Sequence, residues 1–328
     1  MTFFLVVKVL DDRSISETST KNYGTVELRS YLSDTKIETD ALEKSASECG
    51  LDFARLSICA RLATIVECET HSEAVHISEN RFLEVLDLKS TEFSVSTIKT
   101  SRIGLIKDLE SGEITPIKGF GFQPSLTFVM SRGKTNSFDT TNFVLSLKSE
   151  LSERYMRSLH WARNSKNETN PQIKIIFLWF SLEALLKASV TDNCVESYIR
   201  LFLGFPNGRQ LELVSKTLIS NLESHPRYKH WQKKLLEIVL KIRDFRNDSV
   251  HEGFRSVDFT KSELELFSSI MIYAVSRCQA GVMRGLLNNI DSLSEFKEYA
   301  PLLFENNENL INDTHNNIIY SLDHPISY

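Results

Sequence analysis

The spacing of hydrophobic residues along the chain changes once, between residues 120 and 138. Before this segment, apolar side chains mostly alternate with polar ones or form β-branched and aromatic runs, as is typical of strands. After it, they recur every three or four positions, as they do along the buried face of a helix. The segment itself holds glycines and a proline, which favour a domain boundary. The pattern predicts an α+β protein with a β-containing N-terminal domain, residues 1–135, and an all-α C-terminal domain, residues 139–290.

The N-terminal domain is expected to contain several strands and at least one helix. An apolar stripe along residues 74–86 predicts the helix, with Thr70 or Ser72 as its N-cap. Gly112 lies in the turn of a predicted hairpin. The predicted strands are residues 3–10, 55–66, 93–98, 102–109 and 114–118.

Helices are expected throughout the C-terminal domain. Residues 173–186 are apolar on most sides, which predicts a deeply buried helix. After Pro301 the chain is rich in asparagine, so residues 300–328 are expected to form a polar, loosely packed tail in which residues 310–311 and 318–320 can dock. The predicted helices are residues 139–163, 173–186, 194–203, 211–222, 231–250 and 262–287.

The composition is that of a soluble globular chain, with 41% hydrophobic and 25% charged residues. The net charge of −5 gives no general attraction for nucleic acid, so a polyanion site must be a local basic patch. The five cysteines include no Cys-x-x-Cys pair, which favours reduced thiols in a cytoplasmic protein over a zinc site. The apolar start is interrupted at Lys8, too early for a signal peptide or a membrane span. We expect no cofactor, no metal ion and no membrane.

One stretch, residues 242–253, combines a permanent cation with a titratable base near the end of a predicted helix. Arg246 stays charged at physiological pH, whereas His251, five residues later, can exchange a proton near neutrality. Positions five apart on a regular helix point about 140° away from each other. A helix that ends near Val250, with Gly253 as its cap, would let His251 turn toward Arg246. The pair could then hold an RNA phosphate and move protons around it without a metal ion.

The charge around this pair is locally positive, because residues 225–255 hold eight lysines and arginines against four acidic residues. This excess suits a phosphate-binding surface, and it is also common on the solvated face of an amphipathic helix. An Arg-x4-His spacing occurs often by chance. A histidine at a helix end that pairs with carbonyl groups is therefore the competing interpretation.

Three segments, in this order along the chain, resemble a known family. The string Arg-Asp-Phe-Arg-Asn-Asp-Ser-Val-His-Glu-Gly at residues 243–253 resembles the signature of HEPN domains, in which an arginine is followed, usually, by a polar residue and then by a histidine a few positions later. Residues 153–161 and 177–186, the latter with Leu182-Glu183-Ala184-Leu185, resemble the first two helices of the Apea-like HEPN branch. The resemblance covers residues 140–285, less than half of the chain.

The resemblance implies an up-down helical bundle that forms homodimers, with two Arg/His pairs in one cleft. It implies a metal-independent ribonuclease in which Arg246 neutralises the scissile phosphate, His251 acts as general base or acid, and Asn247 orients the phosphate or the histidine. Attack by the 2′-hydroxyl would leave a 2′,3′-cyclic phosphate and a free 5′-hydroxyl. Many members are toxins or anti-phage defence effectors, so the expected partners are RNA, with transfer RNA as a candidate, and a phage-derived or cellular trigger at the N-terminal domain. Other members are not catalytic, and a silent dimerisation or RNA-binding module is the alternative.

Further side chains could support the pair. Glu183 stands inside an apolar helix, and because a buried carboxylate needs a partner, it could hold Arg246 or Arg243 in place. Asp248 and its neighbours are poor helix-interior residues that can bind backbone groups or a phosphate. His160-Trp161, at the end of another predicted helix, could stack on a base, although a core tryptophan beside a rim histidine is the more common arrangement.

Overall fold

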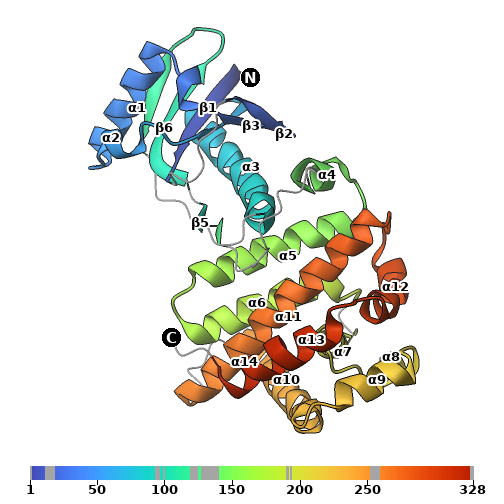
Figure 1. The fold of residues 1–328 in the computed structure, drawn as a ribbon. Helices are drawn as coiled ribbons and strands as arrows, with labels where there is room; N and C mark the ends of the chain where they lie inside the picture. Colours follow the sequence, from blue (N-terminus) through green and yellow to red (C-terminus); the bar gives the residue numbers. More distant parts are fainter. Residues whose placement is uncertain are drawn as a thin grey trace. The chain divides into compact units, whose positions relative to one another are not determined.

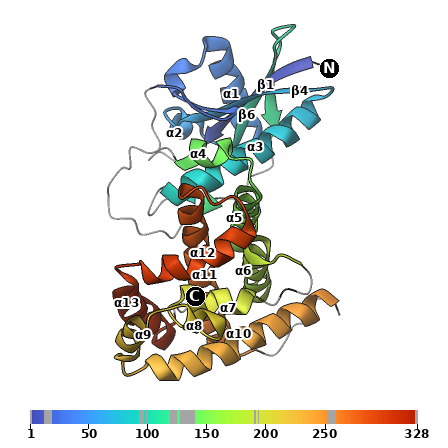
Figure 2. The ribbon, with the colours of Figure 1, turned by 90° about the vertical axis from the view of Figure 1, so that its right-hand side faces the viewer.

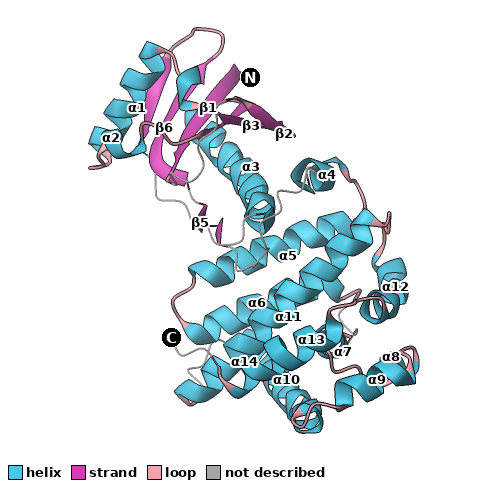
Figure 3. Cartoon of the chain, in the orientation of Figure 1, coloured by secondary structure: helices cyan, strands magenta, loops and turns pink. Residues whose placement is uncertain are grey.

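The chain divides into two compact units, Met1–Leu147 and Lys148–Tyr328, in the computed structural model (Figure 1). The structure describes residues 2–11, 19–92, 97–98, 100–118, 125–126, 140–189, 192, 194–251 and 259–325. The first unit combines a sheet with helices, and the second is helical wherever regular structure is described (Figure 3). The protein therefore mixes α and β structure, with the strands in its N-terminal part, as the sequence pattern predicts.

A six-stranded antiparallel sheet forms the centre of the first unit. Its strands follow the order β2-β3-β4-β1-β6-β7, so the first strand of the chain lies in the interior of the sheet. The strands are β1 (Thr2–Leu10), β2 (Lys21–Tyr23), β3 (Val26–Arg29), β4 (Arg61–Cys68), β6 (Thr100–Asp108) and β7 (Ile114–Lys118). A separate short pair joins β5 (Thr97–Ile98) to β8 (Ser125–Leu126).

Helices pack on both faces of this sheet, because successive residues of a strand point to opposite sides (Figure 2). Val7 of β1 belongs to one core cluster with Leu42 of helix α1, whereas Val6 belongs to the other with Phe82 of helix α3. The helices of this unit are α1 (Lys36–Glu48), α2 (Phe53–Leu56), α3 (His71–Glu92) and α4 (Thr140–Ser146), with a 3₁₀ turn at Tyr31–Ser33.

Several predicted elements of the first unit are confirmed. β1 matches the strand expected at residues 3–10, and β6 pairs with β7 as the expected hairpin, with Gly112 at a φ of 75° in its turn. Helix α3 begins after Thr70, whose hydroxyl accepts a hydrogen bond from the Glu73 amide at 3.2 Å. Of the strand expected at residues 93–98, residues 97–98 are a strand, and residues 93–96 lie outside the described ranges.

The strand predicted at residues 55–66 is wrong in its first half. Asp52 caps the short helix α2, accepting a hydrogen bond from the Ala54 amide at 3.0 Å, and β4 begins only at Arg61. Ile58 lies between these two elements and is 50% exposed, whereas a half-buried strand over residues 55–66 would bury it. Alternation of apolar residues alone cannot distinguish a strand from a short helix followed by a turn.

Helices α5, α6 and α11 form the core of the second unit. Small polar residues lie at the point where they meet: the Ser158 and Ser181 hydroxyls are 2.8 Å apart, and the Gln279 amide donates to Ser158 at 3.0 Å. The helices are α5 (Glu150–Asn167), α6 (Pro171–Leu186), α7 (Val195–Phe202), α8 (Arg209–Glu212), α9 (Lys216–Glu223), α10 (Tyr228–His251), α11 (Lys261–Leu287), α12 (Leu293–Glu305), α13 (Leu310–Asp313) and α14 (Tyr320–Asp323), with a π-helical turn at Thr314–Ile319. The helices predicted at residues 173–186, 194–203, 231–250 and 262–287 are confirmed.

The helix predicted at residues 139–163 is two helices. It breaks at Ser149, which forms a capping box with Ser152 and starts α5. The preceding helix α4 belongs to the first unit, where the Asn142 side chain donates to the Asn22 carbonyl at 2.8 Å and accepts from the Gly24 amide at 3.0 Å. The division of the chain thus falls after residue 147, later than the expected boundary.

A second predicted helix, at residues 211–222, is also divided. Helix α8 ends at Glu212, and the Ser215 side chain accepts a hydrogen bond from the Leu218 amide at 3.4 Å to begin α9. As at the start of α5, a serine ends one apolar repeat and caps the next helix.

Over residues 300–325, the part of this segment that the structure describes, the chain is not the loosely packed polar tail that the sequence predicts. Helices continue to residue 323, and their inward side chains are buried: Leu303, Phe304, Leu310, Ile318, Ile319 and Leu322. The asparagines that suggested a tail lie on the outer face, where Asn317 bonds Asp313, four residues earlier, at 2.7 Å. Of the residues expected to dock, Leu310, Ile318 and Ile319 are buried, whereas Tyr320 is 62% exposed.

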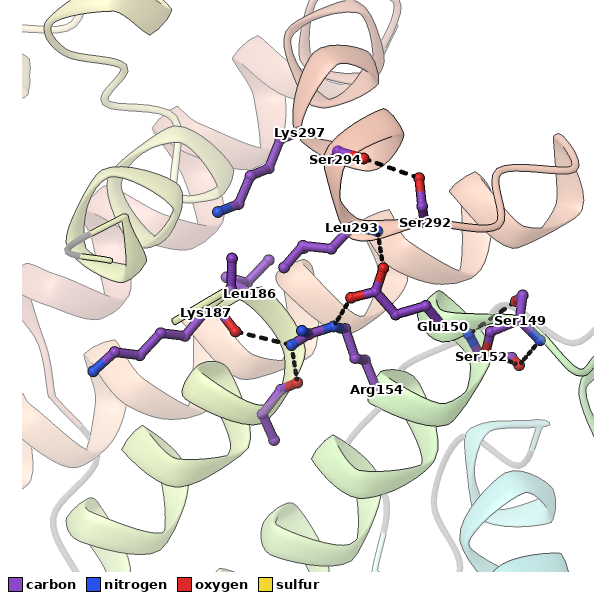
Figure 4. Close-up of polar contacts among 12 residues, drawn as sticks. Ser149, Glu150, Ser152, Arg154, Leu186, Lys187, Ser292, Leu293, Ser294 and Lys297 are labelled. Atoms are coloured by element: carbon purple, nitrogen blue, oxygen red, sulfur yellow. Dashed lines mark hydrogen bonds and ion pairs between the residues drawn. The ribbon is translucent and has the colours of Figure 1, made fainter. Parts of the chain in front are cut away.

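Arg154 and Glu150 join the ends of three helices (Figure 4). The Arg154 guanidinium donates to the carbonyl oxygens of Ala184 and Lys187 at 3.3 and 2.9 Å, and to Glu150 at 2.7 Å. The other carboxylate oxygen of Glu150 accepts from the Leu293 amide, the first residue of α12, at 3.3 Å. Terminal carbonyls and amides that lack partners within their own helix are thereby satisfied, and the last turn of α6 is fixed.

Among the described residues, one helix, α11, is long and apolar enough to cross a membrane by length and composition. More than half of the most apolar stretch of α11 is buried inside the second unit, where the helix packs against α5, α6 and α7. Such burial is also what the central helix of a bundle requires.

Gly204 lies where the C-terminal helices meet the rest of the second unit. Its φ is +94°, and a Cβ added there would overlap the Thr314 side chain. We expect Gly204→Ala to lower the free energy of unfolding by about 2–4 kcal/mol, because backbone strain and overlap add. Urea denaturation measures this loss.

Gly208 offers a matched control, since its φ is +51° but an added Cβ would meet nothing within 4 Å. Gly208→Ala should cost only the backbone strain, about 1–2 kcal/mol. Amide hydrogen exchange at Thr314–Ile319 should become faster in Gly204→Ala and stay unchanged in Gly208→Ala. Equal exchange in the two variants would contradict the packing of this segment against Gly204.

Candidate functional site

Helices α6 and α10 bring the central predicted site residues together. One face of α10 is buried through Leu235, Val239, Ile242 and Phe245, which fixes the rotation of the helix. Arg246 follows at the border of this face, with its side chain 17% exposed. Glu183 stands at the corresponding border of α6, with its side chain 15% exposed. Both charged groups therefore lie at the edge of the apolar core, where little water reaches them.

The Arg246 guanidinium is held from three sides. Nη2 donates to Glu183 Oε2 at 2.5 Å, and Nη1 donates to Asn247 Oδ1 at 3.0 Å. The guanidinium carbon lies 5.3 Å from the centre of the Phe180 ring, a cation–π distance. Nε is buried and has no hydrogen-bond partner among the described residues, so the other contacts set the position of this group.

The Glu183 carboxylate binds two cationic side chains. Oε2 binds Arg246, and Oε1 accepts from Lys187 Nζ at 3.1 Å, one helical turn further along α6. Two positive charges against one negative charge leave a net positive charge at this border. Oriented donors with an excess of positive charge suit a bound anion such as a phosphate.

Asn247 stands between the two members of the Arg/His pair. Helix α10 is regular up to and including His251, one residue beyond the end expected near Val250. On a regular helix His251 lies about 140° around the axis from Arg246 but about 40° from Asn247. Asn247 therefore binds Arg246 through its side chain while sharing a helix face with His251. The His251 side chain and residues 252–258, with the expected cap Gly253, lie outside what the structure describes.

Arg243 and Asp248 are not brought to the Arg246 guanidinium. Arg243 donates to Glu196 of α7 at 2.9 Å and to Asp244 at 3.1 Å. Burial disfavours the charge of Arg243, but these hydrogen bonds outweigh it and hold its pKa above the usual value. Asp248 is exposed and has no hydrogen-bond or ion-pair partner among the residues described. Of the two arginines that Glu183 could hold, the structure pairs it with Arg246.

Two neighbours of the site were missed in the sequence. Lys187 follows Glu183 by four residues, a spacing typical of helical ion pairs, so the signal was present. Phe180 was assigned to a helix buried on most sides, but α6 has one partly exposed face, formed by Ile173, Phe177, Phe180 and Ala184. The apolar run hides this face because hydrophobicity alone does not tell which side neighbouring helices cover.

Comparisons with known proteins do not identify this chain. No model of a known protein family matches it, and neither do the curated proteins or the solved structures. Within the described ranges, no three His, Cys, Asp or Glu side chains are grouped as metal ligands. The contacts of Arg246 and the sequence around it are therefore the features that bear on function.

We expect Glu183→Gln to lower the free energy of unfolding by about 1–3 kcal/mol, since it leaves two partly buried cations beside a neutral amide. Combining it with Arg246→Met in a double-mutant cycle should give a coupling energy of about 1–2 kcal/mol in urea denaturation. If the two substitutions were additive, the direct ion pair would be disproved.

The exposed pair of Glu223 and Lys229 provides the control for this cycle. Its atoms are 3.7 Å apart, and the lysine side chain is 76% exposed. Glu223→Gln should therefore change the free energy of unfolding by less than about 0.5 kcal/mol.

Proposed function

We propose that the second unit is a metal-independent endoribonuclease of the HEPN type, in which Arg246 binds the scissile phosphate and His251 transfers protons. The observation that carries this proposal is the oriented guanidinium of Arg246, held by Glu183 and Asn247 at the end of α10 that also bears His251. A cation that is fixed before the substrate arrives loses little conformational entropy on binding, which supports a role in positioning the phosphate.

In the proposed reaction, the substrate supplies its own nucleophile. Neutral His251 would take the proton of the 2′-hydroxyl as that oxygen attacks the adjacent phosphorus. The bond from phosphorus to the 5′-oxygen then breaks, the leaving oxygen takes a proton from an acid, and a 2′,3′-cyclic phosphate remains. Proton transfer of this kind contributes about 10²–10⁴ in rate, and stabilisation of the phosphorane charge by Arg246 a comparable factor.

We also propose an oligomeric state, a substrate and a cellular role for the protein. A homodimer would bring a second His251 to the cleft as the acid, and RNA, with transfer RNA as a candidate, would be the substrate. A role as a cytoplasmic toxin or anti-phage defence effector rests on the HEPN resemblance alone. A ribonuclease must be restrained in its own cell, so the compact first unit is the proposed receiver of a phage-derived or cellular trigger.

One observation favours the alternative, a catalytically silent dimerisation or RNA-binding module. Both terminal nitrogens of Arg246 already donate within the chain, to Glu183 and Asn247. Two of the five guanidinium N–H donors are thus used and the Nε–H is buried, so a phosphate is left with the second N–H of each terminal nitrogen. The silent module predicts RNA binding that does not depend on His251.

Arg246→Ala and His251→Ala should each slow cleavage of labelled RNA in EDTA by about 10²-fold or more. Products of the wild type should carry cyclic-phosphate ends. His230→Ala is the matched control, since His230 lies in the first turn of α10, about 30 Å from His251 by helical rise. Cleavage that survives in both site variants would refute the assignment.

Asn247→Ala should reduce kcat about threefold to tenfold while KM changes little, because it removes one hydrogen bond that orients Arg246. The pH profile of kcat should shift as well, since Asn247 lies one turn from His251. A merely structural role would instead lower the melting temperature and leave the shape of the pH profile unchanged.

A further inference from the structure

Next to the ion pair lies an aromatic strip, formed by Trp161 of α5 and by Phe177 and Phe180 of α6. The two helices lie side by side (Figure 1). The ring centres of Trp161 and Phe180 are 5.1 Å apart at an interplanar angle of 63°, and those of Trp161 and Phe177 are 5.7 Å apart at 35°. All three side chains are partly exposed. Grouped aromatic side chains that remain open to water commonly mark a binding surface.

The aromatic strip is continuous with the candidate site. Phe180 contacts both, since the Arg246 guanidinium carbon lies 5.3 Å and the Trp161 ring centre 5.1 Å from the centre of its ring. Trp161 is thus two ring contacts from the guanidinium, a distance on the order of 10 Å, which about three nucleotides span at the rise of 3.4 Å within one strand. A ligand whose phosphate lies at Arg246 can therefore reach the strip with a flanking base.

The charge around the aromatic strip matches a polyanion. From Arg157 to Asn167, α5 holds three basic residues and no acidic one; Arg163 is buried, whereas Arg157 and Lys166 reach the surface. Lys174 precedes Phe177 by one turn. Single-stranded nucleic acid combines flat bases with phosphates, and proteins bind it through aromatic faces bordered by cations. A second copy of the chain, docked here about a two-fold axis, would place like charges against each other, which disfavours it as the occupant.

We infer that the aromatic strip stacks an unpaired base of the RNA held at Arg246, so that the substrate is single-stranded beside the bound phosphate. The inference rests on the RNA binding in the proposed function and adds the substrate class. Bases in a duplex are stacked on one another and cannot lie on the strip, so duplex RNA is excluded as the preferred substrate.

The intrinsic fluorescence of Trp161 can report on base stacking. The chain has three tryptophans, and Trp179 and Trp231 are each 2% exposed, whereas Trp161 is partly exposed. A 2′-O-methyl oligonucleotide, which cannot undergo 2′-hydroxyl attack, is titrated into the full-length protein in EDTA. We expect the intrinsic fluorescence to be quenched by the single strand and much less by its duplex. Trp161→Phe should abolish the quenching while keeping most of the affinity.

Trp161→Ala should weaken binding of the same single strand by about fivefold to 100-fold, the usual effect of removing one stacking aromatic residue. Trp161→Phe keeps a stacking ring and should recover most of that loss. Tyr320→Ala is the control, because Tyr320 is an aromatic residue of the same unit that is 62% exposed and far along the chain. Its substitution should leave the affinity unchanged.

The outcomes separate this inference from the proposed function. Cleavage that depends on His251, with affinity and fluorescence indifferent to Trp161, would overturn the inference and leave the nuclease standing. Binding that depends on Trp161 without any cleavage would support the stacking strip and favour the silent module. If Trp161→Ala converted a dimer to a monomer without changing RNA affinity, the strip would be a subunit contact and the inference would fail.

Discussion

The candidate site depends on the ion pair between the Glu183 carboxylate and Arg246. Glu183 lies on α6, which packs against α5 and α11 in the core of the second unit. The last turn of α6 is held by hydrogen bonds from Arg154. A partly buried carboxylate is costly without a cation, so α10 is favoured in the one rotation that brings Arg246 within 2.5 Å. The apolar face of α10 and this ion pair agree on that rotation. Packing and electrostatics thus specify the same arrangement, which is the consistency expected of a well-defined native state.

Much of the fold follows from the sequence, and the errors have common causes. Long periodic segments such as α3, α6, α10 and α11 were predictable because their apolar stripes persist over several turns. Predictions from periodicity were wrong where a serine or an aspartate caps a new helix although the apolar repeat continues, as at Ser149 and Asp52. The prediction was wrong again beyond Pro301, where exposed asparagines are as frequent as the buried leucines and isoleucines that hold the segment in place.

The site was predictable to the extent that its chemistry lies in unusual residues. Glu183 attracted notice because a carboxylate interrupts an apolar run, and Arg246 because of its motif. Of the aromatic strip, the sequence raised only Trp161, as a base-stacking residue that a core tryptophan competes with, because Phe177 and Phe180 belong to a pattern that normally indicates a core. Whether such rings face water depends on which helix covers them, and that is a property of the assembled bundle rather than of any one segment.

The N-terminal end of helix α10 forms hydrogen bonds with Asp323, a residue that is synthesised much later than α10 itself. The indole of Trp231 donates to the Asp323 carboxylate at 2.9 Å, and the same carboxylate accepts from Arg227 at 2.7 Å, although these partners are separated by more than ninety positions in the chain. During synthesis, the N-terminal start of α10 therefore leaves the ribosome well before the residue that completes its environment. Since domains form as the chain emerges from its N-terminus, the contacts around the first turns of α10 are complete only after Asp323 has been added. The order of translation thus delays the N-terminal end of α10, whereas Glu183 and Arg246 are both present long before.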